Sequence, residues 1–370
     1  MTNRRDQAVA IWRAGVEAVD GYHAVARALR DVNDKRPDQI LAVGKAAGAM
    51  TRAALDHFGD VPALVVTKDG HGGGLPPTVR LIEAAHPVPD ARSLAAGRAL
   101  REATGQMAGG STLLLLVSGG TSALAEDLVA GKNLNDLADL NRRLLASGQD
   151  IGAMNARRRK ISRIKGGGLL SAFPGERVRV LAVSDVPGDN LAVIGSGIGA
   201  APDDRTFEFE ASIVASNDVA RQAAAAAARA CGLEVEINEE ALHDDLGALA
   251  ARWGPRIRAM QPGAIVLGGE PTVVLPDNPG RGGRNQALAL ALAREIAGIG
   301  GIVVVAGGTD GSDGPTDAAG GIVDATTWGP GADAALARAD SGRYLAERGA
   351  LLVTGPTGTN VMDLLVAVRA

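Results

Sequence analysis

Residues 302–317 read I-V-V-V-A-G-G-T-D-G-S-D-G-P-T-D. A β-branched apolar run breaks off into four glycines with three aspartates among them. A loop that only connects two elements needs fewer glycines, whereas this composition presents oxygens and bare backbone N–H groups to a ligand. We interpret the segment as a buried parallel strand with its exit loop. It predicts an α/β protein whose small-molecule site is built from loops.

Five other segments repeat this pattern of an apolar run followed by a polar loop with glycine. They are residues 40–45, 113–122, 178–189, 264–270 and 351–360. We predict strands at 40–44, 62–67, 112–117, 177–183, 264–267, 302–306 and 351–353, the fourth closing the first sheet and the seventh being the last. Helical spacing predicts helices at 5–30, from Lys45 onward, at 91–107, 122–130, 221–231 and 284–297, and a helical hairpin at 134–165.

Length and composition limit the class of protein. The 370 residues exceed the roughly 250–300 at which single cores stop growing, so we expect two domains, 1–235 and 236–370. Only 2% of residues are aromatic and the net charge is −4, which disfavours nucleic acid as a partner. No apolar run approaches the roughly 18–20 residues that span a bilayer. Asp6 and Arg13 interrupt the place of a signal-peptide core, and the single Cys231 suits a reducing cytoplasm.

Nucleotide-binding motifs are the first test of function. The P-loop pattern G-x-x-x-x-G-K-[ST] does not occur. Residues 195–200, G-S-G-I-G-A, satisfy the loose dinucleotide pattern G-x-G-x-x-A. Pro202 follows at once, however, where the fingerprint requires a helix whose N-terminus holds a pyrophosphate. The sequence therefore disfavours a dinucleotide site here without excluding one.

Two segments are better candidates for anion binding. Ser118-Gly119-Gly120-Thr121-Ser122 combines convergent N–H groups with hydroxyls before an expected helix; a tight strand–helix turn is the alternative. Lys45 directly follows Gly44 at a strand exit, which places its ammonium at the sheet edge where α/β proteins bind ligands.

Charged residues elsewhere fit the same chemistry. Arg284 stands at the start of an expected helix, where its charge opposes the dipole unless an anion binds there. Asp185 and Asp189 leave one strand together and could accept a hydroxyl proton or hold Mg²⁺, although turn formation is the alternative for any single aspartate. Arg158, Ser162 and Lys165 fall on one helical face if the segment is helical; a solvated charge run is the alternative. His71 and His86 have no partner at metal-ligand spacing.

The chain resembles the class II glycerate 2-kinases, whose members are often named hydroxypyruvate reductases. The matching segments, in order, are A-V-G-K-A-A, G-H-G-G-G, A-A-H-P-V-P-D, V-S-G-G-T-S-A-L, N-A-R-R-R-K-I-S-R-I-K-G-G, S-D-V-P-G-D, A-S-N-D, G-G-E-P-T-V, G-R-G-G-R-N-Q, G-T-D-G-S-D-G-P-T-D-A-A-G and T-G-P-T-G-T-N. They extend over nearly the whole chain. The resemblance implies a Rossmann-like parallel-sheet N-terminal domain, a smaller α/β MOFRL domain and an active site in the cleft between them.

The resemblance also implies ATP-dependent phosphorylation of D-glycerate at its C2 hydroxyl, with Mg²⁺, giving 2-phosphoglycerate. Lys45 is similar to the motif lysine that acts on the transferred phosphoryl group, Arg284 to the arginine that faces it, and Asp185 to the acid that orients the hydroxyl. The remaining predicted contacts fall into three groups. They are Ser118, Gly119, Gly120, Thr121, Ser122, Arg158, Lys165, Asp189 and Asn217 for substrate or phosphate; Gly268, Gly269, Glu270, Gly308, Thr309 and Asp310 for nucleotide; and Asp313 for the metal.

A few positions depart from the family pattern. They are Gly168 in place of arginine, Ile198-Gly199 in place of Pro-Thr, Ala287 in place of glutamate and Met362 in place of asparagine. These positions bear on phosphate and sugar-acid contacts and on which hydroxy acid is preferred. An NAD(P)H-dependent hydroxypyruvate reductase and a non-catalytic sugar-acid or nucleotide sensor stay as alternatives. Small molecules are the expected partners, and a homodimer is the assembly considered.

Overall fold

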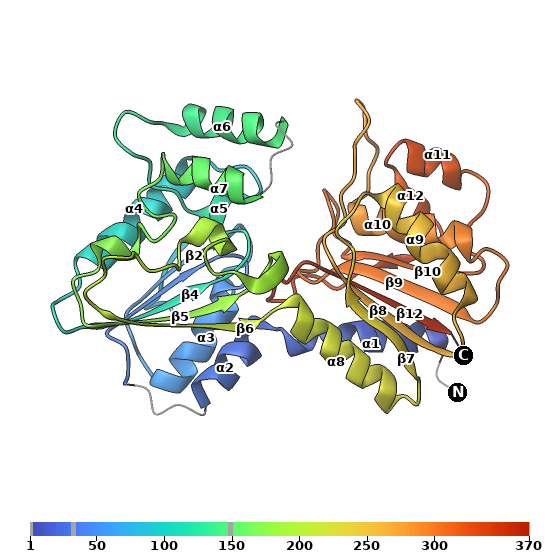
Figure 1. The fold of residues 1–370 in the computed structure, drawn as a ribbon, viewed down its shortest axis with the longest axis horizontal. Helices are drawn as coiled ribbons and strands as arrows, with labels where there is room; N and C mark the ends of the chain where they lie inside the picture. Colours follow the sequence, from blue (N-terminus) through green and yellow to red (C-terminus); the bar gives the residue numbers. More distant parts are fainter. Residues whose placement is uncertain (1–2, 31–34, 147–150, 370) are drawn as a thin grey trace. The chain divides into compact units, whose positions relative to one another are not determined.

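The computed structural model describes residues 3–30, 35–146 and 151–369. The chain forms two compact units. The N-terminal unit comprises residues 20–216 and 358–360, and the C-terminal unit comprises residues 1–19, 217–357 and 361–370 (Figure 1). The domain border predicted at residue 235 stays a prediction, because the compact units divide the chain at several positions instead of one.

The N-terminal unit contains a six-stranded sheet in which every neighbouring pair is parallel. Its strand order is β3-β2-β1-β4-β5-β6, the doubly wound order of Rossmann-like folds. The order reverses between β1 and β4, which makes their carboxyl ends the topological switch point. The predicted Rossmann-like parallel sheet is therefore confirmed. The strands are β1 (Gln39–Val43), β2 (Ala63–Lys68), β3 (Arg80–Ala84), β4 (Thr112–Val117), β5 (Arg177–Val183) and β6 (Glu208–Ala215).

Helices cover both faces of this sheet, which explains why its central strands are apolar throughout. The helices α2 (Gly21–Arg30) and α3 (Ala47–Phe58) lie on one face (Figure 1). The other face carries α4 (Ala91–Gly105), α5 (Thr121–Leu124), α6 (Leu134–Ala146) and α7 (Ile151–Arg159). Alternate residues of β4, Leu113, Leu115 and Val117, pack into the core beneath α4. Short 3₁₀ turns, η1 (Leu170–Ala172), η2 (Pro187–Asp189) and η3 (Ile194–Gly197), lie in the connections on either side of β5.

The C-terminal unit contains a mixed six-stranded sheet in the order β11-β10-β9-β12-β8-β7. The strand β9 (Ile302–Gly308) lies between two antiparallel neighbours, β10 (Gly320–Asp324) and β12 (Asp363–Arg369). The expectation that residues 302–306 form a parallel strand is therefore wrong. Burial of both faces produces the continuous apolar run, and burial does not encode the direction of the neighbours. The remaining strands are β7 (Val235–Glu240), β8 (Gly263–Gly269) and β11 (Leu351–Leu352).

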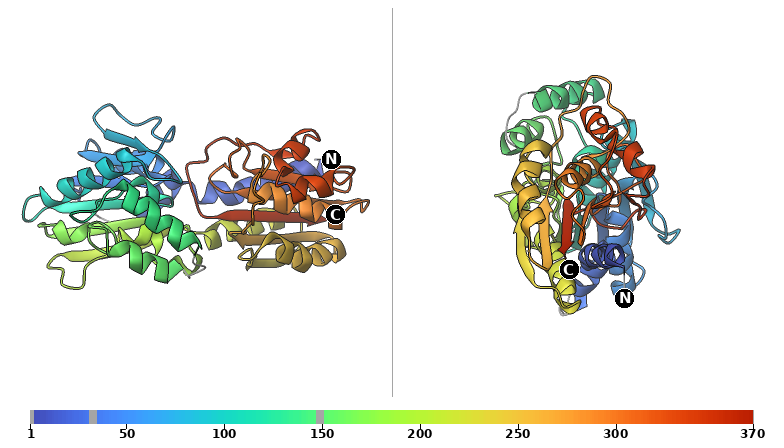
Figure 2. Two further views of the ribbon diagram at one scale, coloured as in Figure 1. Left: turned by 90° about the horizontal axis from the view of Figure 1, so that it is seen from above. Right: turned by 90° about the vertical axis from the view of Figure 1, so that its right-hand side faces the viewer.

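The first helix of the chain belongs to the C-terminal unit. The helix α1 (Arg4–Ala18) packs with α8 (Asn217–Ala230) on one face of the mixed sheet (Figure 2). Trp12 is fully buried there, and its Nε1–H donates to the carbonyl oxygen of Leu364 at 2.9 Å. The opposite face is covered by α9 (Leu246–Ala259), α10 (Arg284–Glu295), α11 (Ala332–Ala337) and α12 (Ser341–Ala346).

Several predicted element bounds are corrected. The helix expected over residues 5–30 is two helices, because the Asp20 side chain accepts from the His23 N–H at 3.0 Å and starts α2. The helix expected at 122–130 ends at Leu124, since Ala125 is extended. β5 does not close the first sheet and residues 351–353 are not the last strand, because β6 and β12 follow them. No helix in the described part of the chain could cross a membrane.

Candidate functional site

The switch point of the N-terminal unit brings Lys45 and the loop of residues 118–122 together. The Lys45 N–H donates to the carbonyl oxygen of Gly119 at 2.9 Å. The Ser118 hydroxyl accepts the Ala46 N–H at 3.0 Å. A Cβ on Gly44 would lie 2.2 Å from the Ser118 Oγ, so only glycine fits between the two loops. The exits of β1 and β4 thus form one structure, as expected for a ligand site of this fold.

Two glycines allow side chains to approach this loop. A Cβ on Gly120 would lie 3.2 Å from both the Lys45 Cγ and the His86 Cδ2. A Cβ on Gly119 would lie 2.4 Å from the Asp185 Oδ2 and 2.1 Å from the Asn360 Nδ2. Lys45 and Asp185 therefore reach the same pair of glycines from different strands. A polar site at this edge can hold an anion and accept a hydroxyl proton.

Thr121 and Asp189 are two further residues of the N-terminal unit that were predicted to contact substrate or phosphate. The Thr121 hydroxyl donates within the loop, to the carbonyl oxygen of Ser118 at 2.7 Å, and lies 3.1 Å from that of Val43. Asp189 lies in η2, four residues after Asp185, and is partly buried. Its contact with substrate stays a prediction.

The basic segment does not form the expected helical face. The helix α7 ends at Arg159, so Ser162 and Lys165 lie beyond it. Arg158 donates to the side-chain oxygens of Asn141 at 3.2 Å and Asn155 at 3.3 Å, and burial lowers the pKa of Arg158. Lys165 is buried rather than solvated. The idea of a solvated charge run is therefore wrong for Lys165, and a phosphate contact by either side chain stays a prediction.

In the C-terminal unit, Arg284 is held by two carboxylates at the carboxyl ends of β8 and β9. Its Nε donates to the Asp363 Oδ2 at 2.7 Å and its Nη1 to the Glu270 Oε1 at 2.6 Å. Asp363 lies beside Gly269 in β8 and Gly308 in β9. Burial alone would lower the pKa of Arg284, but the two carboxylates raise it above its ordinary value. Arg284 is thus a fixed cation at this edge.

Asp313 caps the helix that Arg284 begins. Its two carboxylate oxygens accept the N–H groups of Asn285 at 3.1 Å and Gln286 at 2.8 Å. Burial raises the pKa of Asp313 to about 7, against the lowering effect of these two hydrogen bonds. The protein's own carboxylates therefore supply negative charge at this helix start, and a bound anion at Arg284 stays a prediction. Binding of a metal by Asp313 stays a prediction and would require it to release these N–H groups.

Asn217 and the predicted nucleotide residues lie at the same edge, and the predicted contact of Asn217 with substrate or phosphate stays a prediction. The Asn217 Oδ1 lies only 1.7 Å from where a Cβ on Gly268 would be, and the Asn217 Nδ2 donates to the carbonyl oxygens of Val361 at 2.9 Å and Asp363 at 3.0 Å. The Thr309 hydroxyl donates to the carbonyl oxygen of Met362 at 2.6 Å. These contacts fix the turn that leads into β12. Nucleotide contacts by Gly268, Gly269, Glu270, Gly308, Thr309 and Asp310 stay predictions.

Comparison with known proteins identifies the family. Residues 7–231 match the domain of unknown function DUF4147, and residues 263–363 match the MOFRL family. A D-glycerate 2-kinase of Thermotoga maritima is 36% identical over 408 residues, which cover 98% of this chain and 97% of that protein. A crystal structure of glycerate kinase (EC 2.7.1.31) from Thermotoga maritima superposes with a TM-score of 0.87, at 33% identity and over 99% of each chain.

The chain belongs to the class II glycerate 2-kinase family. A glycerate 2-kinase of Pyrococcus horikoshii is 33% identical over 95% of this chain and 94% of that protein. A relative from Agrobacterium vitis with the provisional name hydroxypyruvate reductase is 36% identical over 88% of this chain and 97% of its own length. Both kinds of name that the sequence resemblance predicted therefore occur among the relatives.

The loop that a reductase would need does not have the geometry of a dinucleotide site. Residues 194–197 form the short turn η3, in which Gly195 and Ser196 have positive φ angles of 56° and 59°. No α-helix lies between β5 and β6, a stretch that the structure describes throughout. A pyrophosphate would therefore find no helix N-terminus after this glycine-rich segment. Instead, the Ser196 hydroxyl of this turn lies 2.8 Å from the Ser122 Oγ and donates to the Asn155 Oδ1 at 3.1 Å.

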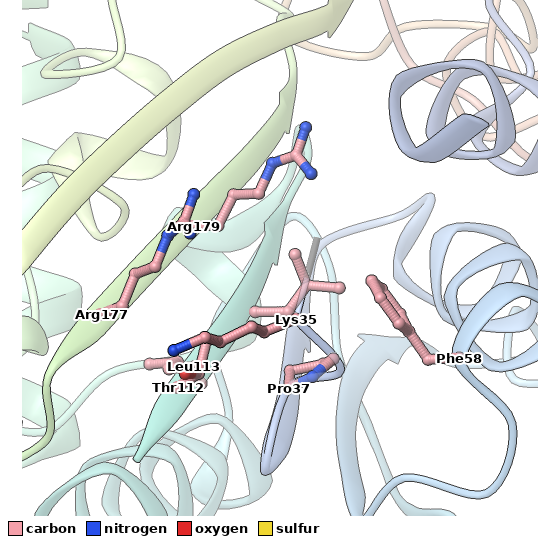
Figure 3. A pocket seen from close by; sticks show the side chains of 8 residues that line it. Lys35, Pro37, Phe58, Thr112, Leu113, Arg177 and Arg179 are labelled. Atoms are coloured by element: carbon pink, nitrogen blue, oxygen red, sulfur yellow. The ribbon is translucent and has the colours of Figure 1, made fainter. Parts of the chain in front are cut away.

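The N-terminal unit has a hollow lined by residues at the start of three strands (Figure 3). It opens at the amino ends of β1, β4 and β5, and Arg177 and Arg179 point their guanidinium groups along one side. Both arginines form ion pairs with Glu210, at 3.1 Å and 3.8 Å. The lining residues are Lys35, Pro37, Phe58, Thr112, Leu113, Leu114, Arg177 and Arg179. α/β enzymes bind substrates at the carboxyl ends of their strands, whereas this hollow lies at the amino ends.

Sequence reasoning missed several residues of the site. Asp363, the partner of Arg284, and Glu126, which is paired with Lys165, lack a local motif, because each is defined by a partner distant in the chain. The sequence showed no metal-binding partner for His86, and Asn360 lay in a matching segment without an assigned role. No group of three or more His, Cys, Asp or Glu side chains in the described ranges could hold a metal ion.

Proposed function

We propose that this chain transfers the γ-phosphoryl group of ATP to the C2 hydroxyl of D-glycerate, giving 2-phosphoglycerate and ADP. The observation that carries the proposal is the 36% identity to a D-glycerate 2-kinase over 98% of this chain. The position of Lys45 and the loop 118–122 at the Rossmann switch point supports it. Phosphoryl transfer depends mainly on positioning and on neutralising oxygens, which a lysine and glycine N–H groups provide.

In this mechanism the glycerate O2 attacks the γ-phosphorus and the bond to the ADP oxygen breaks. Asp185 orients the hydroxyl and accepts its proton. Lys45 and Arg284 neutralise the oxygens of the transferring group. Residues 118–122 bind an anionic group of the substrate through the backbone N–H groups, which the glycines leave accessible.

We further propose that Mg²⁺ accompanies the nucleotide. Magnesium is usually held by one or two carboxylates together with phosphate oxygens, so the protein needs no ligand cluster of its own. When bound, it would neutralise charge on the phosphates. Asp313, the predicted ligand, already accepts a hydrogen bond from the first turn of α10. Its neighbour Asp310 accepts the Ser312 N–H at 2.9 Å within the same loop. Small-molecule substrates, a cytoplasmic location and a homodimer complete the proposal.

The test measures phosphoryl transfer from Mg²⁺-ATP to D-glycerate. A coupled assay monitors ADP release, and ³¹P NMR identifies the product. We expect 2-phosphoglycerate from the unmodified protein. Lys45→Met should lower kcat by about 10²–10³-fold, as for the loss of one electrostatic stabiliser. Lys132→Met, which changes an exposed lysine paired with Asp136 in the same unit, should leave kcat unchanged. An inactive unmodified protein that oxidises NADH with hydroxypyruvate would favour the reductase instead.

A further inference from the structure

A buried ion pair lies directly behind the loop 118–122. The Lys165 Nζ is 2.6 Å from the Glu126 Oε2, and the two side chains are 2% and 0% exposed. The second carboxylate oxygen of Glu126 accepts the Ser162 hydroxyl at 2.5 Å. Glu126 is fixed from its backbone as well, because its N–H donates to the carbonyl oxygen of Ser93 at 3.0 Å. Both charges are thus compensated inside the protein.

Such a pair is seldom explained by stability alone. The cost of removing two charges from water cancels much of their attraction, and apolar replacements often stabilise a protein equally well. The ammonium group of Lys165 is already engaged inside the protein by Glu126. Its remaining contact shows what the pair holds, since the Lys165 Nζ donates to the carbonyl oxygen of Ser122 at 3.3 Å.

Ser122 is held from a second side. Its hydroxyl lies 2.8 Å from the Ser196 Oγ, and the Ser196 hydroxyl donates to the Asn155 Oδ1 at 3.1 Å. A hydroxyl has one proton, so Ser122 must be the donor in the serine pair. The proton of Ser122 is therefore used within the protein, and its carbonyl and hydroxyl are both anchored. Ser122, which lies in α5 at the end of segment 118–122, therefore has little freedom to move.

We propose that Glu126 and Lys165 are positioning residues whose ion pair fixes Ser122 and, through it, the geometry of the loop 118–122. This inference rests on the proposed function only for its kinetic consequence. It assigns a role to Glu126, which no sequence motif indicated. It also replaces a direct phosphate contact by Lys165 with an action through the loop.

The test compares Glu126→Gln, Lys165→Met and the double variant. Each single change leaves one uncompensated buried group and should lower Tm, whereas the double variant removes both charges and should recover Tm to near the original value. In the double variant we still expect kcat/KM for D-glycerate to fall at least tenfold. We also expect faster amide hydrogen exchange in residues 118–124, with exchange in β4 unchanged. The matched control, Lys132→Met with Asp136→Asn, removes an exposed pair and should change none of these quantities.

The outcomes separate the two proposals. Recovery of Tm, kcat/KM and exchange together in the double variant would mean that the pair is only structural. Unchanged exchange at 118–124 overturns the positioning role whatever the activity of the unmodified protein. If the unmodified protein shows no phosphoryl transfer but exchange rises in the double variant, the proposed function fails and the positioning role stands.

Discussion

Arg284 and Asp363 are joined by two hydrogen bonds, from the Arg284 Nε to the Asp363 Oδ2 at 2.7 Å and from the Nη2 to the Oδ1 at 3.2 Å. The carboxylate is 2% exposed and the arginine side chain is 34% exposed. One side of the guanidinium is therefore fixed inside the protein while another part faces water. This is the geometry of a cation that is oriented by a buried partner and can still meet an anion.

Loss of that carboxylate should therefore disorder Arg284. We expect Asp363→Asn to destabilise the protein by about 3 kcal/mol, the lower end of the range for breaking a buried pair, because Arg284 retains access to water and to Glu270. Phosphoryl transfer should fall with it. Urea unfolding and initial rates measure the two effects. Asp333→Asn, which removes the partner of Arg294 in an exposed pair, should cost less than about 1 kcal/mol and leave the rate unchanged. Equal effects of the two variants would contradict this role.

Asp313 should make the stability depend on pH. Its pKa is raised by burial from 3.8 to about 7 in the folded protein. Between these values the folded protein binds a proton that the unfolded chain has released, so raising the pH through this window lowers the free energy of unfolding. Above about pH 7 both states are ionised and the contribution becomes constant.

The comparison with Asp313→Asn isolates this effect. We expect the unfolding free energy of the unmodified protein, minus that of the variant, to decrease between about pH 4 and pH 7 and to level off above, as measured by urea unfolding. Asp317→Asn changes an exposed acid of the same loop and serves as the control. A difference for Asp313→Asn that does not vary with pH would exclude a raised pKa.

Gly120 offers a test of the packing around Lys45. Its φ angle is 86°, and an added Cβ would lie 3.2 Å from the Lys45 Cγ and from His86. Gly120→Ala should cost about 1–2 kcal/mol of stability through the left-handed backbone, and it should also displace Lys45 and lower kcat. Gly131→Ala has a similar φ of 80° but no atom within 4 Å of its Cβ. It should cost the same stability and leave kcat unchanged, so equal rates in the two variants would count against a role for this contact.

The strand exits could be predicted from the sequence because burial and loop chemistry are local properties. Apolar runs ending in G-K and S-G-G-T-S predicted strand exits at a ligand-binding edge, and the structure joins these exits through the Lys45 N–H and the Gly119 carbonyl oxygen. Strand direction could not be predicted, since a strand buried on both faces reads alike with parallel or antiparallel neighbours. The apolar run L-L-V-A-V at residues 364–368 is typical of a strand, yet the central strand β12 was not among the predicted strands. Its partners β8 and β9 lie far away in the chain.

Residues whose role depends on a partner distant in the chain could not be predicted from the sequence either. Asp363 acquires its role only when β12 lies between β8 and β9 beside Arg284. The sequence explained the charge of Arg284 at a helix start by a bound anion, whereas Asp363, Glu270 and Asp313 supply negative charge from three separate segments. A positive charge at a helix start can thus predict a nearby negative group, but it does not identify the residue or ligand that supplies that group.

The last prediction concerns the assignment of α1 to the C-terminal unit. Trp12 is fully buried against the mixed sheet, and its indole N–H is bonded to β12. Trp12→Ala should therefore destabilise this unit by about 3–5 kcal/mol, the usual cost of emptying a large core site. Trp12→Phe should cost less, since it keeps most of the volume and loses the hydrogen bond. Trp328→Ala, which removes a partly buried tryptophan stacked on Arg294 in the same unit, serves as the control. Urea unfolding followed by circular dichroism measures all three, and a cost for Trp12→Ala no larger than that for Trp328→Ala would mean that α1 contributes little to this core.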